Sequence, residues 1–233
     1  MKIGRRLAIK ILNASKFTLT LASDSKADSG SVSNPLDQAL LSKLLNLIET
    51  TTLAFDEFDY ARALERTEQF FWSFTDDYVE LVKARAYGSQ GAQEAQSAHV
   101  TLKITLETLL RLFAPFLPFV TAEIWSWSHQ DSIHSAPWPT PDELSDGLKK
   151  GIDIGILDAA SETLSEVRRA KTEAKRSLKV KAATVVVSAS NERIKQVGLA
   201  RNDLIEAGNI DALELVEQEE APPSVEVTLA QEE

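Results

Sequence analysis

Four stretches in the N-terminal half of the chain repeat apolar side chains every three or four positions, which is the spacing of an amphipathic helix. The last of these stretches carries Leu102, Leu106, Leu109, Leu110 and Phe113. Four amphipathic helices joined by short connections bury their apolar faces by packing together as a bundle. The predicted fold class is therefore mainly α, beginning with a helical bundle.

Turn residues divide this region into helices. Asn34 before a proline, with Asp37 three residues further on, predicts a helix start, because the Asn oxygen accepts a backbone N–H that has no partner in the helix. Gly88 predicts a helix end, and Pro115 and Pro118 break the helix before them. A polar loop is expected at 23–33. The predicted helices cover residues 2–21, 35–55, 60–87, 92–114 and 119–127.

A second, smaller unit follows the bundle. The proline-rich stretch at 129–151 predicts a crossover between two domains. Beyond it the pattern predicts helices at 154–178 and 191–207 and strands at 183–189, 211–216 and 225–230. The predicted divisions are a bundle at 1–140, a linker at 141–153, a small α+β subdomain at 154–218 and an acidic tail at 219–233. We expect disorder in the tail, with a partly ordered strand as the alternative.

The net charge of −10 argues against nucleic acid, because a polyanion repels an acidic surface. The acidic excess is local, however, since residues 203–233 hold ten acidic and no basic side chains. Residues 1–16 hold five basic and no acidic side chains, and residues 166–181 hold seven basic and two acidic ones. Two basic patches therefore remain. The second is either a phosphate-contacting row or a solvated helix face, and we favour the solvated face.

The basic N-terminal helix is the strongest candidate site. Its cations share an arc of about 140 degrees opposite Ile3, Leu7 and Ile11, and Phe17 falls in the same arc. A basic row can hold phosphates and a flat ring can stack on an unpaired base, which predicts RNA binding. The alternative interpretation is a solvated face with a locally packed aromatic ring. The predicted RNA-binding residues are Lys2, Arg5, Arg6, Lys10, Asn13, Lys16 and Phe17.

The sequence holds no recognisable catalytic centre. The absence of cysteine excludes disulfides and thiolate chemistry. His129 and His134 flank Asp131, but this spacing is not that of a zinc helix, so we do not favour a metal site. Gly88 and Gly91 lack the Lys and Ser or Thr that complete a phosphate-binding loop. We therefore predict no catalytic residue, no metal ligand and no cofactor in this chain.

No targeting or membrane signal is recognisable either. The basic start MKIGRRLAIK is not followed by an apolar run of signal-peptide length. No stretch approaches the roughly 18 apolar residues of a membrane span. We expect a soluble, cytoplasmic protein.

Four blocks of residues 1–140 resemble, in order and spacing, the anticodon-binding region of valyl-tRNA synthetases, which are class I tRNA ligases. The blocks are MKIGRRLAIKILNASKF, FFWSFTDDYVELVK, LRLFAPFLPFVTAEIW and SIHSAPWP. The later segment VRRAKTEAKRSLKV is similar to the small C-terminal subdomain of this family, less specifically. Departures from the family are Thr75, where cysteine is frequent, Ala122, where glutamate is frequent, and the lack of a long C-terminal heptad arm.

This resemblance implies a bundle that recognises the anticodon stem and loop of tRNA, with Phe17 stacked on an anticodon base. Arg5, Arg6, Asn13 and Lys16 match polar positions of the family's first helix. The His-Ile-Gly-His-like and Lys-Met-Ser-Lys-Ser-like loops of class I ligases do not occur in this sequence. The chain is therefore not expected to attach valine to tRNA alone, and ATP and Mg²⁺ are implied only for a catalytic domain that it lacks.

The implied partners are a tRNA, with valine as the favoured amino acid, and the catalytic domain of the same synthetase, in cis or in trans. The chain is interpreted as a fragment or the product of a split gene. Three alternatives remain open: a helical protein-docking module derived from the synthetase domain, the equivalent region of an isoleucine-type ligase, and an independent enzyme built on the His129 loop.

Overall fold

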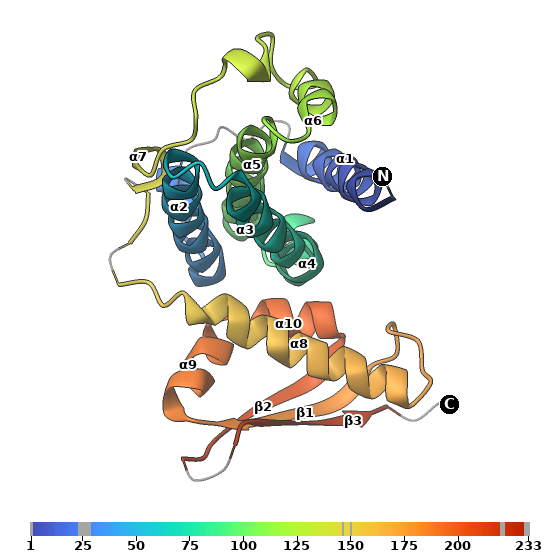
Figure 1. Ribbon diagram of the computed structural model, residues 1–233. Helices are drawn as coiled ribbons and strands as arrows, with labels where there is room; N and C mark the ends of the chain where they lie inside the picture. The colour runs from blue at the N-terminus through green and yellow to red at the C-terminus, as the bar shows by residue number, and fades with distance from the viewer. Residues whose placement is uncertain (1, 23–28, 146, 150, 220–221, 231–233) are drawn as a thin grey trace.

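The computed structural model describes residues 2–22, 29–145, 147–149, 151–219 and 222–230. A helical bundle lies above a small α+β subdomain (Figure 1), which confirms the predicted fold class. The bundle contains α1 (Lys2–Ala22), η1 (Ser29–Ser31), α2 (Pro35–Asp56), α3 (Tyr60–Ser73), η2 (Phe74–Tyr78), α4 (Val79–Ala86), α5 (Ala92–Phe113) and α6 (Pro118–Trp125). Two short helices, η3 (Ile133–Ser135) and α7 (Asp142–Ser145), follow α6. The subdomain contains α8 (Gly155–Glu173), β1 (Ala182–Ala189), α9 (Asn191–Leu199), α10 (Arg201–Gly208), β2 (Ile210–Glu217) and β3 (Ser224–Leu229).

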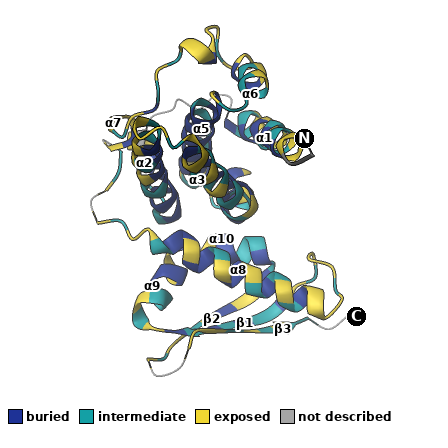
Figure 2. Cartoon of the chain, viewed as in Figure 1, coloured by how far each residue is buried: buried dark blue, intermediate teal, exposed yellow. Residues whose placement is uncertain are grey.

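The apolar stripes predicted from the sequence form the bundle core. Helix α5 is central and contacts α1, α2, α3, α4 and α6. Its stripe, which includes Leu102, Leu106 and Phe113, is buried, and Figure 2 shows buried faces turned inward on each of the long helices. Asn34 caps α2 as predicted, because its side chain accepts a hydrogen bond from the Leu36 N–H at 2.9 Å. The predicted loop at 23–33 falls mostly outside the described residues.

The segment predicted as one helix at 60–87 is helical over that range but changes its hydrogen-bonding pattern in the middle. Helices α3 and α4 are joined by η2, a π-helical turn. Such turns insert an extra residue into a helix and are frequent at functional sites. Helix α4 ends before Gly88, whose φ of 93° suits glycine because it carries no Cβ.

The subdomain is a three-stranded sheet with helices α8 and α10 over one face (Figure 1). The strand order is β2-β1-β3, with β1 parallel to β2 and antiparallel to β3. Val185 and Val187 of β1 are buried under the helices. Val186 points to the opposite face, where Glu214 of β2 and Glu226 of β3 are its register partners. One face of the sheet is therefore apolar and covered, and the other is uncovered and carries these two glutamates.

Three sequence-based predictions for the subdomain were wrong. The single helix predicted at 191–207 is two helices, because Ala200 leaves the helical conformation between them. The helix predicted to reach Leu178 ends at Glu173, where Lys175 adopts a left-handed φ of 54° and the Arg176 N–H bonds back to the Lys171 carbonyl. The expected disorder of the tail does not hold for Ser224–Leu229, which pair with β1 and so match the predicted strand at 225–230.

A buried arginine joins the subdomain to the bundle. Arg85 of α4 is 0% exposed and donates two hydrogen bonds to Asp37 of α2, at 2.8 and 2.7 Å. Its Nε donates to Asp203 of α10 at 2.9 Å. The hydroxyls of Tyr78 and Ser97 also donate to Asp37, at 2.7 and 2.6 Å. Two carboxylates therefore share one guanidinium, and the buried cluster has an acidic excess of one charge when both are ionised.

Asp203, the second carboxylate of this cluster, is buried as well. Burial raises the pKa of Asp203 to about 6, although the guanidinium of Arg85 acts in the opposite direction. Between the ordinary pKa of an aspartate and about 6, the folded state holds a proton that the unfolded state has released. Ionisation of Asp203 therefore costs folding free energy as the pH rises through this interval.

We predict that the wild-type chain gains stability relative to Asp203→Asn as the pH falls from 7 to 5. The expected gain is at most about 1.4 kcal/mol per pH unit, the limit for one proton. Urea unfolding of both proteins at pH 5, 6 and 7 measures the difference directly. Parallel stability profiles for the two proteins would contradict the prediction.

Candidate nucleic-acid interface

The predicted site residues lie on the face of α1 that is turned away from α5. Four of them are exposed: Arg5, Arg6, Asn13 and Lys16. Lys10 and Phe17 are half-buried, and the Lys2 side chain lies outside the described part of the chain. The structure therefore places the predicted polar residues along one face of α1. Other residues partly cover this face at Lys10 and at Phe17.

A second row of side chains, on α3, η2 and α4, faces this helix. Its members are Trp72, Asp76, Lys83 and Tyr87, spaced by four, seven and four residues so that they share one helix face. At the start of the row, the guanidinium of Arg6 lies 5.5 Å from the centroid of the Trp72 ring, and the ammonium of Lys10 lies 6.0 Å from it. Lys10 also forms an ion pair with Asp76 at 2.8 Å.

The other end of the row contacts Phe17. The Phe17 and Tyr87 rings meet edge to face, with centroids 6.4 Å apart and an interplanar angle of 74°. The ammonium of Lys83 lies 6.0 Å from the centroid of the Phe17 ring. Because early residues of α1 meet Trp72 and later ones meet Tyr87, the two rows run in the same direction. We call the combined surface of the two rows the α1–α4 rim.

Tyr87 changes the assignment of the stacking ring. The sequence pattern predicted that Phe17 presents a free flat face, but Phe17 is half-buried against the core and against Tyr87. The Tyr87 side chain is 67% exposed, so it offers more open ring surface than Phe17 does. Sequence reasoning missed Trp72, Lys83 and Tyr87. Their spacing shows that they share a helix face, but only the tertiary structure shows that this face meets α1.

The rim is basic despite the acidic composition of the whole chain. Asp76 neutralises Lys10, and its side chain is half exposed. The structure gives no ion pair within its described residues to Arg5, Arg6, Lys16 or Lys83. These four cations therefore remain available for an external anion, and exposed aromatic surface lies among them.

The other basic patch behaves differently. Arg168 of α8 pairs with Glu80 of α4 at 3.3 Å, and Arg169 pairs with Glu166 at 2.5 Å. Lys171 is not on a solvated face as we expected, because its ammonium is buried and donates to backbone carbonyls. The cations of α8 itself are thus engaged within the chain.

The histidine loop does not resemble a metal centre. The ring of His129 stacks on Trp125 at 3.7 Å between centroids, and His134 is exposed. Within the described residues, the structure places no group of three histidine, cysteine or acidic side chains that could hold a metal ion.

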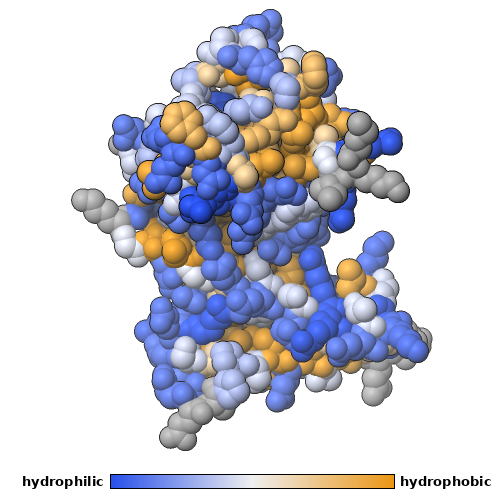
Figure 3. Space-filling view, viewed as in Figure 1, coloured by the Kyte–Doolittle hydropathy of each residue, from blue (hydrophilic) through white to orange (hydrophobic). Residues whose placement is uncertain are grey.

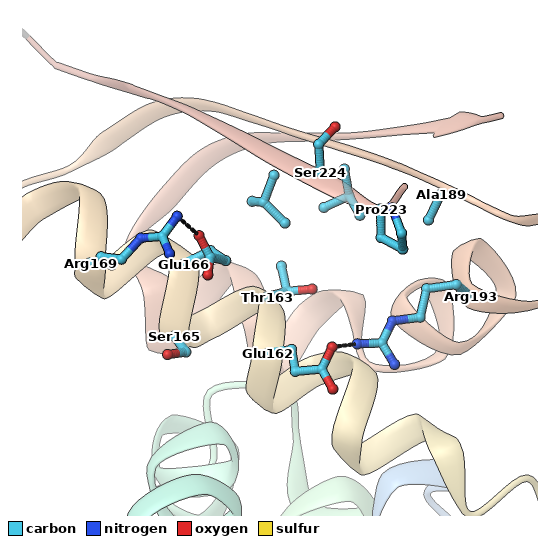
Figure 4. A pocket seen from close by; sticks show the side chains of 11 residues that line it. Glu162, Thr163, Ser165, Glu166, Arg169, Ala189, Arg193, Pro223 and Ser224 are labelled. Carbon is cyan, nitrogen blue, oxygen red and sulfur yellow. Dashed lines mark hydrogen bonds and ion pairs between the residues drawn. The ribbon is translucent and has the colours of Figure 1, made fainter. Parts of the chain in front are cut away.

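A pocket of about 460 Å³ lies between α8 and the sheet (Figure 4), and its charged walls are already paired. In it Arg169 points to Glu166 and Arg193 points to Glu162 (Figure 4). The charges that a ligand would need are thus used by the protein itself. The candidate site is therefore the α1–α4 rim.

Comparison with known proteins places the larger part of the chain in a described family. Residues 37–187 match the model of a family described as the anticodon-binding domain of tRNA ligase. The chain belongs to this family. None of the described helices combines the length and the apolar run needed to cross a bilayer.

The anticodon-binding domain has relatives that share almost all of its length. It is 48% identical over 99% of its residues to a valine–tRNA ligase of Thermobifida fusca, of which it covers 26%. It is 42% identical over 98% to a valine–tRNA ligase of Salinispora tropica and 43% identical over 91% to one of Cutibacterium acnes, covering 28% and 24% of them. The chain thus spans about a quarter of the length of these curated relatives.

Proposed function

We propose that this chain binds the anticodon arm of tRNA as a non-catalytic part of a valine–tRNA ligase in protein synthesis. The observation that carries the proposal is the α1–α4 rim, where exposed aromatic surface lies among cations without ion pairs. The family of the domain and the names of its relatives support the same conclusion. They do not favour the alternative of a protein-docking module.

The cations and the aromatic rings of the rim would contact different parts of the RNA. Arg5, Arg6, Lys16 and Lys83 would contact phosphates, which gives affinity and salt dependence without reading sequence. Tyr87, with Phe17 supporting it from the side, would stack on an unpaired base of the loop. Stacking on single-stranded bases is the usual way in which proteins hold RNA loops.

In this proposal the chain does not catalyse the reaction of the ligase. Attachment of valine to tRNA would require the catalytic part of the ligase, joined to this domain in cis or in trans. ATP and Mg²⁺ would be used there, and this chain would hold neither. Its contribution is to select and position the tRNA.

The anticodon provides the first test. We predict that the chain binds a valine-tRNA anticodon stem-loop more tightly than the same stem-loop with an unrelated anticodon. The comparison keeps phosphate contacts constant and changes only the loop bases, so the difference isolates base recognition. Fluorescence anisotropy with both labelled hairpins measures it, and equal affinities would count against anticodon recognition.

Replacement of the exposed ring gives a second prediction. Tyr87→Ala should weaken binding to the valine hairpin by about 1–3 kcal/mol, the usual contribution of one base–aromatic stack. Phe58→Ala is the matched control, because Phe58 is 78% exposed but lies in the turn between α2 and α3, away from the rim. Both variants should keep the wild-type unfolding temperature within a few degrees. Equal losses in the two variants, or no loss in Tyr87→Ala, would refute the assignment.

Replacement of Asp76, the acidic residue of the rim, should raise RNA affinity rather than lower it. Asp76→Asn should increase RNA affinity several-fold at low salt, because it frees Lys10 and removes a charge that repels phosphate. The gain should shrink as salt increases, since exposed charges are screened. A titration of each protein at 50 and 200 mM salt tests this. Unchanged or weaker binding would show that Asp76 lies outside the RNA footprint.

A further inference from the structure

The loop between α8 and β1 is built around a buried lysine. Lys171 is 1% exposed, and its ammonium donates to the carbonyls of Leu178 and Gly208 at 3.1 and 2.7 Å. Burial lowers the pKa of Lys171, which is the cost of placing this ammonium inside the protein. Asn209 donates to the Lys179 carbonyl at 2.7 Å from the other side. These bonds fix the course of residues 174–181.

The loop at 174–181 carries exposed lysines that form no ion pair with the described residues. Lys175 and Lys179 are exposed, and Lys175 projects from a left-handed turn that a lysine adopts only at an energetic cost. Lys181, next to them, is already paired with Asp211 at 2.9 Å. The loop is therefore shaped by interior bonds, while its two exposed lysines form no ion pair with the described residues.

Among the lysines and arginines with described side chains, the cations without an ion pair or a charged-group hydrogen bond gather mainly in two places. Most of their charged groups bind a carboxylate, a carbonyl or another group of the chain. The structure gives neither an ion pair nor a charged-group hydrogen bond to Arg5, Arg6, Lys16, Lys83, Lys149, Lys175, Lys179 and Lys195. All but Lys149 and Lys195 lie on the α1–α4 rim or on the 174–181 loop.

The rim and the loop are on the same side of the molecule. In Figure 1 the loop that follows α8 and the N-terminal end of α1 both lie at the right, one below and one above. Figure 3 shows a recess in the surface between them, bordered below by hydrophilic residues. An ion pair between Arg168 and Glu80 at 3.3 Å links α8 to α4.

We propose that Lys175 and Lys179 form a second RNA-contacting site. This site binds backbone phosphates of the same RNA whose anticodon loop is bound by the rim. This inference rests on the proposed function and extends it to the subdomain. Ammonium groups on long side chains bind phosphates as point charges and do not discriminate between bases. The second site therefore adds affinity and orientation, while selection of the anticodon stays with the rim.

The test compares two double variants that remove the same charge. In the full chain, Lys175→Gln with Lys179→Gln should weaken binding to a valine-tRNA anticodon hairpin about tenfold at low salt. The slope of log affinity against log salt should fall by about one for each lysine. The loss should be the same for a hairpin with an unrelated anticodon. Lys149→Gln with Lys195→Gln, at exposed positions away from the recess, should leave affinity and slope unchanged.

Each outcome has a distinct meaning. If the two double variants lose affinity equally, or neither does, the second site is refuted. If Tyr87→Ala weakens binding while the Lys175 and Lys179 variant does not, the proposed function stands and only this inference fails. If neither weakens binding, both fail. A loss that differs between anticodons would also overturn the inference, because phosphate contacts carry no sequence information.

Discussion

The buried guanidinium of Arg85 is the interaction on which the arrangement of the two parts depends. It binds Asp37 from the second helix of the bundle and Asp203 from the subdomain, and so joins elements far apart in the sequence. Removing the guanidinium would leave two buried carboxylates without a cation, which costs several kcal/mol. The bundle and the subdomain therefore hold each other in one relative orientation.

The Arg85 cluster also affects the candidate site, because α4 carries both Arg85 and the rim residue Lys83. Arg85 points into the protein from the helix turn whose other positions, Lys83 and Tyr87, belong to the rim. Ser89, just beyond, donates to Glu206 of the subdomain at 2.8 Å. The backbone that carries the exposed Tyr87 ring is thus fixed by bonds to the subdomain. A ring on a fixed backbone loses less conformational freedom when it stacks on a base.

Much of this could be predicted from the sequence, because helices and caps are local. The apolar stripes, the Asn34 cap and the stop at Gly88 depend on spacings of a few residues, and the structure follows them. The Arg85–Asp203 pair spans 118 positions, and no local pattern indicates it. For the same reason the polar face of α1 was predictable, whereas Tyr87 was not, since its contact with Phe17 arises only when two helices pack.

The overall charge of the chain conceals how its cations are used. Most basic side chains are neutralised where the fold needs them, as in the pair of Lys181 with Asp211. The acidic tail that makes the net charge negative contributes β3, whose Glu226 lies with Glu214 on the uncovered face of the sheet. This face is opposite to the one covered by α8 and α10, and its two glutamates would repel phosphate. An RNA strand would therefore be favoured at the rim and recess and disfavoured beneath the sheet, and a protein of net charge −10 can still bind a polyanion on one side.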